Sequence, residues 1–391
     1  MTAAASGARR ALVLSGYWPP HDGGVERYAQ AMAEELAGRG WEVHAAFSDV
    51  GAAASRESPS VRLHPYPVRT IAGRLPVPDP AVSGFRRVRR ALASMPFDLV
   101  IVMSHHYLAN VLLARAVAAR ETLWINHVSG HVPAGGGVVE RLAHRYEHML
   151  AGLQRRICTR AAAVSTAAAA WLDHLGVHTA TVLPNAVRPD AVTPTRAGSD
   201  VGPTSPTSPT SPTTLRLVYA GRIEPHKGWD TAIEVVRRLA LALPEGHEVV
   251  LDVAGGGTRA AELAALARDV PQVRLHGPLP HGEVIALLAR SDVLLLTSRY
   301  PEGLPTVLLE AGTVALPVVT FPAGGTTDLV VDRVTGRVVD DAEGAVAALL
   351  ALHADRRAAS ALGLALEARV REGFTWPRVV DALLEEVQHV A

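Results

Sequence analysis

The chain has 391 residues, and its 38 Lys and Arg side chains balance its 38 Asp and Glu side chains. Zero formal net charge argues against a nucleic-acid-binding protein that acts through bulk charge, and a hydrophobic fraction of 48% argues against a disordered chain. At roughly 150 residues per domain, the length predicts two or three domains. The single cysteine, Cys158, leaves no internal disulfide and fits a reducing compartment. Lys227 is the only lysine, so the residues around it are of special interest.

The N-terminal segment resembles a signal peptide only superficially. Arg9 and Arg10 precede a short apolar run, which ends at Pro19 and Pro20. A signal peptide needs a longer apolar region, and no apolar run in the sequence reaches the length of a membrane span. We therefore expect residues 11–15 to form the first buried strand of a cytoplasmic protein.

The first half of the chain alternates short apolar runs with helical patterns, which predicts parallel strands joined by crossover helices. After the first strand, apolar residues recur at helical spacing until Gly38 and Gly40 end the helix. Residues 48–96 carry no motif that we can interpret. Further buried strands are expected at 42–47, 99–103, 122–125 and 161–165.

Residues 198–214 differ in composition from the rest of the chain. Their core, residues 203–213, repeats Pro-Thr-Ser and so places a proline at every third position. Such a backbone lacks hydrogen-bond donors and favours an extended, solvated conformation. We interpret residues 191–214 as an interdomain linker. A long surface loop within one domain is the alternative, although long structureless loops are uncommon in compact domains.

The alternating pattern restarts after this segment and predicts a second α/β domain. Ligands of such domains bind beyond the carboxyl ends of the strands, so we expect the functional site in a cleft between two doubly wound domains. Strands are expected at 215–220, 249–254, 273–276, 293–297 and 317–320, and helices at 230–243, 259–268 and 306–312.

Two cations, Arg222 and Lys227, follow the first strand of the second half in the sequence Gly-Arg-Ile-Glu-Pro-His-Lys-Gly. They lie in a turn that enters a helix, where backbone amides and two positive charges suit a diphosphate. The Walker A pattern is absent. A pair of solvated surface cations is the alternative, and the uniqueness of Lys227 favours the diphosphate.

Two carboxylates, Glu302 and Glu310, are separated by seven residues. Gly303 and Leu304 lie in the loop that enters the following helix, whose free amides suit an anion. Glu310 falls about a turn and a half into that helix, where a carboxylate can accept hydrogen bonds from both vicinal hydroxyls of a ribose. The alternative is that Glu302 complements the helix dipole and Glu310 is merely exposed, and spacing alone favours it.

A glycine pair, Gly23 and Gly24, lies between the first strand and the first helix, in the sequence Pro-Pro-His-Asp-Gly-Gly-Val-Glu-Arg. Glycine lets a ligand approach the backbone closely. By itself the pair is a weak signal, because an ordinary strand-to-helix turn has the same residue types.

His127 follows the buried strand expected at 122–125, and His131 follows soon after. The end of a buried strand faces the ligand in α/β folds, which makes His127 a candidate for the site. The chain has 17 histidines, so a structural role is the default for any one of them.

Three further patterns are weaker. Residues 255–257 open a helix in a dinucleotide-like pattern, but no acidic residue follows at the end of the next strand. The sequence His144-Arg-Tyr-Glu147-His148 fits a zinc pattern, but a convincing third ligand is lacking, so we expect a solvated helix face. Residues 85–90 include four arginines, which favour a solvated helix over contact with anionic lipid. No D-x-D pair occurs, and no metal site is predicted.

Together these residues resemble the family-4 retaining glycosyltransferases of the GT-B fold. The resemblance covers most of the chain, and the two spaced glutamates in this context are its specific part. Its other parts are the Pro-Pro-x-x-Gly-Gly opening, the Leu-Pro-Asn segment that ends at Asn185, the Gly-Arg-(x)4-Lys-Gly turn, the Gly-Gly-Gly segment at 255–257, the pair Gly324-Gly325 and the closing Phe374-Thr-Trp376 helix.

The resemblance implies two Rossmann-like domains that face an interdomain cleft. Residues 1–190 would form the acceptor-side domain, 191–214 the linker, 215–373 the nucleotide-sugar-binding domain, and 374–391 a helix that crosses back to the first domain. The implied activity is transfer of a hexosyl group from a UDP- or GDP-sugar to a hydroxyl acceptor, with retention of anomeric configuration.

The resemblance also implies a donor site in the second domain. Arg222 and Lys227 would bind the diphosphate and stabilise it as it leaves, in place of a metal. Gly303 and Leu304 would offer amides to the same phosphates, and Glu310 would bind the ribose. No cofactor is expected besides the nucleotide-sugar donor.

The remaining implied residues lie around the reacting sugar. Glu302 would lie near the donor sugar, and His127 would donate a hydrogen bond to a sugar hydroxyl. Gly23 and Gly24 would line the phosphate and acceptor side.

Two other functions stay open at this point. One is a nucleotide-sugar epimerase or a phosphorylase of the same fold, and the other is a non-catalytic nucleotide-sugar-binding module. The expected partners are the donor and a small-molecule, lipid or glycan acceptor, without nucleic acid. Peripheral contact with the inner membrane face and the oligomeric state are left open.

Overall fold

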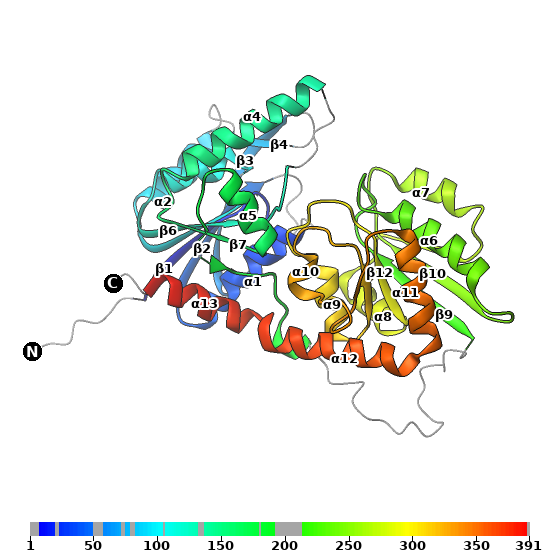
Figure 1. Cartoon of the computed structure of the whole chain (residues 1–391). Coiled ribbons are helices and arrows are strands. Elements are labelled where there is room, and N and C mark those ends of the chain that lie inside the picture. Colours follow the sequence, from blue (N-terminus) through cyan, green and yellow to red (C-terminus); the bar gives the residue numbers. More distant parts are fainter. Residues whose placement is uncertain are drawn as a thin grey trace, which may run out of the picture. The chain divides into compact units, whose positions relative to one another are not determined.

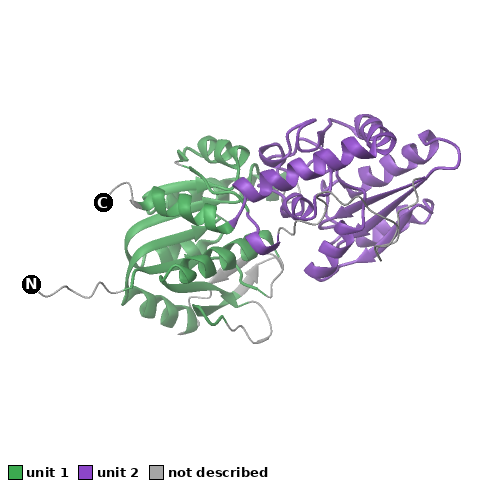
Figure 2. Cartoon of the chain, turned by 90° about the horizontal axis from the view of Figure 1, so that it is seen from below, with its two compact units in different colours: residues 1–185, 376–391 green, residues 186–375 purple. Residues whose placement is uncertain are grey.

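The computed structural model describes residues 8–19, 23–49, 58–71, 75–78, 83–104, 106–131, 137–179, 181–191 and 213–388. The chain divides into two compact units, which Figure 2 shows in different colours. Unit 1 comprises Met1–Asn185 and Trp376–Ala391, and unit 2 comprises Ala186–Thr375. The closing helix, for which the sequence predicts a return to the first domain, therefore groups with unit 1. Residues 192–212 lie outside the described residues, so the linker stays a prediction.

Unit 1 is an α/β domain around an eight-stranded sheet (Figure 1). Its described elements are β1 (Arg10–Leu14), α1 (Gly24–Gly38), β2 (Glu42–Asp49), β3 (Val61–Ile71), β4 (Leu75–Pro78), α2 (Ser83–Ala93), β5 (Pro96–Met103), α3 (Leu108–Ala114), β6 (Ala118–Asn126), α4 (Gly137–Gln154), β7 (Arg160–Ala163), α5 (Thr166–His174), β8 (Thr181–Val182) and α13 (Trp376–Gln388). The strand order is β4-β3-β2-β1-β5-β6-β7-β8. All neighbouring strands are parallel except the pair β3–β4.

The core of unit 1 follows from the apolar run of β1. Residues 11–14 are fully buried, because β1 has a strand on each side and crossover helices cover the sheet. Helix α1 buries an apolar stripe that includes Tyr28 and Leu36. Helix α13 packs on the same region, with the rings of Tyr28 and Trp376 edge to face and their centroids 4.9 Å apart.

Unit 2 is a second α/β domain, in which all paired strands are parallel. Its described elements are a 3-10 turn (Pro189–Ala191), β9 (Thr214–Ala220), α6 (Trp229–Ala242), β10 (Glu248–Ala254), α7 (Ala260–Ala267), β11 (Val273–Gly277), α8 (His281–Ala289), β12 (Val293–Leu296), α9 (Thr306–Thr313), β13 (Val318–Thr320), α10 (Thr326–Leu329), β14 (Arg337–Val338), α11 (Ala342–Ala354) and α12 (Arg356–Gly373). The strand order β11-β10-β9-β12-β13-β14 is that of a Rossmann-like domain. The prediction of two Rossmann-like domains is confirmed.

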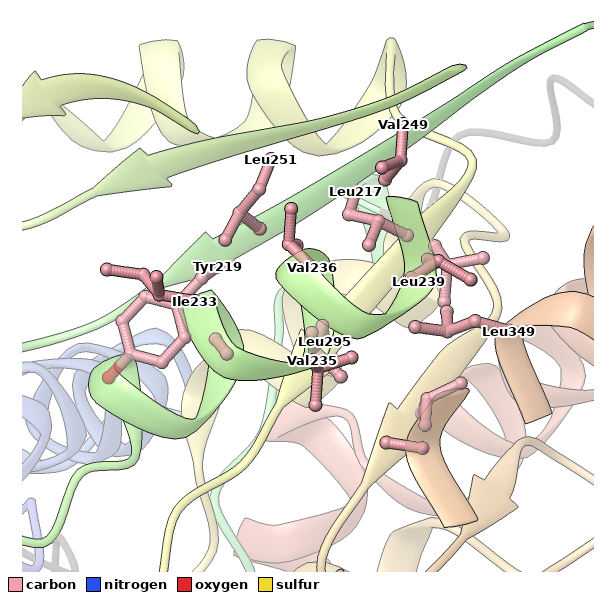
Figure 3. Close-up of a cluster of buried hydrophobic side chains, with 14 of the residues drawn as sticks. Leu217, Tyr219, Ile233, Val235, Val236, Leu239, Val249, Leu251, Leu295 and Leu349 are labelled. Atoms are coloured by element: carbon pink, nitrogen blue, oxygen red, sulfur yellow. The ribbon is translucent and has the colours of Figure 1, made fainter. Parts of the chain in front are cut away.

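One apolar cluster of unit 2 lies between α6 and the sheet (Figure 3). Ile233 and Val236 of α6 belong to the same buried cluster as Leu217 of β9. Tyr219 also belongs to this cluster, but its hydroxyl donates a hydrogen bond to the carbonyl of Lys227 over 3.0 Å. The apolar core thus reaches the turn that carries the lysine and fixes its backbone.

The predicted strands are all present, with ends shifted by a few residues. Four strands were not predicted: β3, β4, β8 and β14. In β3, Pro65 and Pro67 argue against a strand, because proline cannot donate to a ladder. Alongside these prolines β2 is the only described strand that pairs with β3, since β4 joins from Val68 onward. The prolines therefore lie where β3 has a described strand on one side only. A missing backbone N–H donor is tolerated at such an edge.

Gly228 and Gly246 allow a matched test of backbone packing in unit 2. Both have a left-handed backbone, with φ of 80° and 79°. A Cβ at Gly228 would lie 1.9 Å from the carbonyl oxygen of Thr297, whereas a Cβ at Gly246 would meet no described atom within 4 Å. We expect Gly246→Ala to cost about 1–2 kcal/mol of stability for its conformation, and Gly228→Ala to cost on the order of 3 kcal/mol or more. Urea unfolding followed by circular dichroism measures both, and equal losses would contradict the steric role of Thr297.

Candidate functional site

The strand order of unit 2 reverses between β9 and β12, and α/β sheets bind ligands beyond the carboxyl ends of the strands at such a point. Two loops meet there: residues 221–228 after β9, here named the cation loop, and residues 297–305 after β12. The Thr297 hydroxyl donates a hydrogen bond to the carbonyl of Gly228 over 2.6 Å. The end of the cation loop is therefore fixed to the end of β12.

Lys227 and Glu302 come from these two loops and form an ion pair. Nζ of Lys227 lies 2.6 Å from Oε1 of Glu302 and 4.3 Å from the centroid of the Tyr300 ring. Both side chains are largely buried, with exposed fractions of 13% and 15%. Burial lowers the pKa of Lys227 below its ordinary value, and the charge of Glu302 partly offsets this effect. Two residues that the sequence assigns to one site are thus in direct contact.

Ser298 and Tyr300 support this ion pair, although no sequence motif indicated them. The Ser298 hydroxyl donates a hydrogen bond to Oε1 of Glu302 over 2.9 Å, and the backbone N–H of Tyr300 donates to Oγ of Ser298 over 3.2 Å. Both residues lie in the loop that follows β12. Their place after a buried strand was the signal that could have found them.

Arg222 is exposed at the start of the cation loop. Its positive charge adds to burial in lowering the pKa of Lys227, so the two predicted cations lie close enough to interact. A buried cation and an exposed one therefore share the same loop.

The glycines at 255–257, which follow β10, fit closely against the cation loop. A Cβ at Gly255 would lie 1.8 Å from the carbonyl oxygen of Gly221, and a Cβ at Gly257 would lie 2.4 Å from that of Ile223. The backbone N–H of Ile223 donates to this segment in return, over 2.9 Å. The dinucleotide-like pattern thus has a structural explanation, because side chains here would displace the loop that carries the two cations.

Glu310 lies in α9, which Gly303 and Leu304 precede. Its exposed fraction is 9%, so the alternative of a merely exposed carboxylate is wrong. Oε1 of Glu310 lies 3.5 Å from Nδ1 of His281, a residue at the start of α8 that no sequence signal indicated. Helix α9 has no acidic residue in its first turn, and Pro305 at its N-cap offers no capping side chain. No acidic side chain of the first turn therefore offsets the positive end of the α9 helix dipole.

In unit 1, His127 directly follows β6 and is buried, with an exposed fraction of 8%. Its ring packs edge to face on Tyr28, with the centroids 4.7 Å apart. Burial lowers the pKa of His127 to about 3, so the imidazole is neutral near pH 7. Nε2 is buried and has no hydrogen-bond partner within the described part of the chain. Such a nitrogen can bond to a ligand hydroxyl.

Gly23 is the N-cap residue of α1, Gly24 is its first residue, and residues 20–22 of the same motif lie outside the described residues. A Cβ at Gly23 would lie 2.0 Å from Oε2 of Glu26, which is buried. Glu26 is the third helical residue, from which a carboxylate can fold back over the helix N-terminus. The Glu26 carboxylate can shift, so its approach alone does not require glycine at this position, and contact with a ligand stays a prediction.

The zinc-like pattern lies on α4, where the sequence analysis expects a solvated face. This expectation is wrong for Glu147, whose exposed fraction is 2%. Nδ1 of His131 lies 2.7 Å from Oε2 of Glu147, so a third candidate ligand is present.

The basic pattern at 85–90 lies on α2, and its arginines are exposed as expected. Within the described ranges, no helix has the length and apolar character to cross a membrane.

His127 makes the stability of unit 1 sensitive to acid. The folded state keeps this ring neutral until the pH approaches about 3, whereas the unfolded chain binds a proton at about pH 6.5. The unfolded state binds more protons between these values, so stability falls as the pH drops through this window. His127→Gln removes the effect. Between pH 7 and 5, the wild type should lose about 2 kcal/mol more stability than this variant.

Urea unfolding of the wild type and the variant at both pH values measures this difference. His178→Gln is the matched control, because the His178 side chain is fully exposed in the same unit. An equal acid loss in the wild type and His127→Gln would show that burial of His127 does not govern its protonation.

Two family models match consecutive parts of the chain. The model described as Glycosyltransferase Family 4 matches residues 22–191, and the model described as Glycosyl transferases group 1 matches residues 205–365. The first range falls largely in unit 1 and the second in unit 2.

Several known proteins are similar to parts or to nearly all of this chain. Glycogen synthase of Mycobacterium tuberculosis is 36% identical over 172 residues. The match covers 42% of this chain and spans 40% of that relative's length. A GDP-mannose-dependent alpha-(1-6)-phosphatidylinositol monomannoside mannosyltransferase of Mycolicibacterium smegmatis is 27% identical over 96% of this chain and 97% of that protein. The structure of Anabaena HepE in complex with UDP and glucose matches with a TM-score of 0.74, at 17% identity, over 98% of this chain and 100% of that chain. The fold is that of the GT-B glycosyltransferases, and the two family models together support a glycosyltransferase of the family-4/GT-B type.

Proposed function

We propose that the chain transfers a hexosyl group from a UDP- or GDP-sugar to a hydroxyl acceptor, with retention of the anomeric configuration. The observation that carries this proposal is the largely buried ion pair of Lys227 and Glu302 where the strand order of unit 2 reverses. α/β sheets bind nucleotides at such points. A buried lysine acts strongly on a diphosphate, because little water screens its charge.

Arg222 and Lys227 bind the diphosphate and stabilise the negative charge that develops as it leaves. Lys227 can keep its contact with Glu302 while it donates to a phosphate, because an ammonium group carries three N–H donors. Exposed Arg222 adds a planar donor fork that suits a phosphate. Gly303 and Leu304 offer amides near the positive end of α9.

The two cations take the place that a metal holds at other diphosphate sites. A metal-bound diphosphate needs carboxylate ligands, and the sequence has no D-x-D pair. The nearby carboxylate of Glu302 is engaged by Lys227 and Ser298. We infer that the transfer does not require a metal at the diphosphate.

The other site residues act on the two sugars of the donor. Glu310, a buried carboxylate, accepts hydrogen bonds from the ribose hydroxyls. Glu302 lies near the donor sugar, and His127 donates a hydrogen bond to one of its hydroxyls. Glycosyl transfer passes through a transition state with oxocarbenium character, and a neutral imidazole does not oppose that positive charge.

The donor nucleotide is UDP or GDP, and the acceptor carries a hydroxyl group. The mannosyltransferase relative is named for GDP-mannose and the HepE complex contains UDP and glucose, which supports either base. The acceptor is a small molecule, a lipid or a glycan, and Gly23 and Gly24 line its side of the reaction. A lipid acceptor would bring the chain to a membrane surface, where the exposed arginines at 85–90 can attract anionic headgroups.

The competing functions are those of an epimerase, a phosphorylase and a non-catalytic nucleotide-sugar-binding module. A phosphorylase needs a further phosphate or cofactor site, and a chain with one lysine supplies few groups for it. Release of UDP or GDP together with an acceptor glycoside identifies a transferase. A wild type that releases no nucleotide with any donor and acceptor would contradict the proposed function.

Lys227→Ala tests the role of the buried cation in catalysis. We expect kcat/KM to fall about 10²- to 10³-fold, as on removal of one preorganised charge from a transition state. Steady-state nucleotide release measures this ratio. Arg238→Ala is the control, because it removes an exposed cation from α6 in the same unit. An unchanged kcat/KM in Lys227→Ala would rule out the diphosphate role.

Glu310→Ala tests the ribose contact without requiring turnover. We expect the Kd of UDP or GDP to rise about 10- to 100-fold, because hydrogen bonds to a charged group are lost. Glu283→Ala on α8 is the control, since Glu283 is acidic and exposed. Calorimetric titration measures both, and an unaltered Kd for both nucleotides in Glu310→Ala would exclude this contact.

A further inference from the structure

A cluster of three potential metal ligands lies in unit 1: His131, His144 and Glu147. His144 and Glu147 are three residues apart on α4, which places them on one face of the helix. His131 comes from the segment that follows His127. Its Nδ1 atom lies 2.7 Å from Oε2 of Glu147 and 3.3 Å from Nδ1 of His144.

The two contacts of His131 Nδ1 compete with each other. A ring nitrogen has one in-plane position, which holds either a proton or a lone pair. A protonated Nδ1 can donate to Glu147 but cannot accept from His144, and an unprotonated one cannot bond to a carboxylate. A cation between the three atoms removes this conflict, because each atom can then offer a lone pair to it.

The spacing of the three ligand atoms suits zinc. Zinc binds imidazole nitrogen and carboxylate oxygen at about 2.0–2.2 Å in a tetrahedron, so its ligand atoms lie about 3.3 Å apart. The three separations here are 2.7, 3.3 and 4.0 Å, which scatter around that value. Two histidines and a glutamate are also a ligand set of zinc sites that keep a fourth position for water.

Further contacts hold the ligand side chains in place. Nε1 of Trp171 donates to Oε1 of Glu147 over 3.2 Å, on the oxygen that does not face His131. Nε2 of His131 lies 2.7 Å from Oε1 of Glu140, an ion-pair contact without the alignment of a full hydrogen bond. Metal-bound histidines commonly place their second nitrogen against a carboxylate, which orients the ring.

We propose that His131, His144 and Glu147 bind one Zn²⁺ ion, with solvent at the fourth position. His148, the second histidine of the sequence pattern, is not assigned as a ligand, because among the described residues only His131, His144 and Glu147 bring their ligand atoms within 4.8 Å of one another here. The ion belongs to unit 1, takes no part in the diphosphate chemistry assigned to unit 2, and fastens the segment behind His127 to α4.

Zinc binding to the full-length, tag-free chain tests this proposal. After incubation with Zn²⁺ and gel filtration, we expect one Zn²⁺ per chain by elemental analysis and a raised Tm. His131→Ala and His144→Ala should each weaken the Kd for Zn²⁺ by more than tenfold. Glu140→Gln should weaken it about 10- to 100-fold, as loss of an orienting carboxylate does. His148→Ala, on the same helix, should bind Zn²⁺ as the wild type does.

Three results would overturn the proposal: no stoichiometric Zn²⁺ on the wild type, equal binding by all variants, or loss in His148→Ala with retention in His131→Ala. The last result would assign the ion to the sequence pattern instead. Circular dichroism of each variant confirms that it is folded. All readouts concern the metal and the fold, so failure of the zinc site leaves the proposed transfer reaction untouched.

Discussion

Lys227 is held in a largely buried position by Glu302, and the loops after β9, β10 and β12 fit closely together next to that contact. An ammonium group loses hydration on burial and needs an anionic partner close by. Glu302 lies in another loop than Lys227, so the two loops must keep a fixed position relative to each other. The hydrogen bond from Thr297 to the Gly228 carbonyl and the close fit of the glycines at 255–257 against the cation loop maintain it. Backbone packing and electrostatics are therefore coupled here.

The two units use polar groups in different ways. Unit 2 keeps a fixed positive charge buried beside a carboxylate, which suits a ligand of high negative charge. Unit 1 buries His127 in its neutral form beside Tyr28, which suits hydroxyl groups. Three other histidines of this unit, His106, His131 and His144, lie within 4.0 Å of the buried carboxylate of Glu147, so the same residue type has distinct roles only a few positions apart.

Much of the fold could be predicted because buried parallel strands appear as unbroken apolar runs. β3 was missed because its prolines argue against a strand, and its partial edge position is visible only in three dimensions. The cation loop could be recognised from the uniqueness of Lys227 and from the family resemblance. The contact of Lys227 with Glu302, and the arrival of His131 at Glu147, join residues distant in sequence. Neither contact follows from local patterns, because both depend on how loops and helices pack.

The solitary lysine also has a practical consequence. An amine-reactive reagent can modify only this side chain and the α-amino group of the chain. Because burial lowers the pKa of Lys227, a larger fraction of it is unprotonated, and so nucleophilic, at a given pH than for an exposed lysine. The protein thus contains one side-chain amine that can serve as a chemical reporter, at the residue proposed to bind a phosphate. Protection of that amine from labelling would report occupancy of the site directly, without a substrate that turns over.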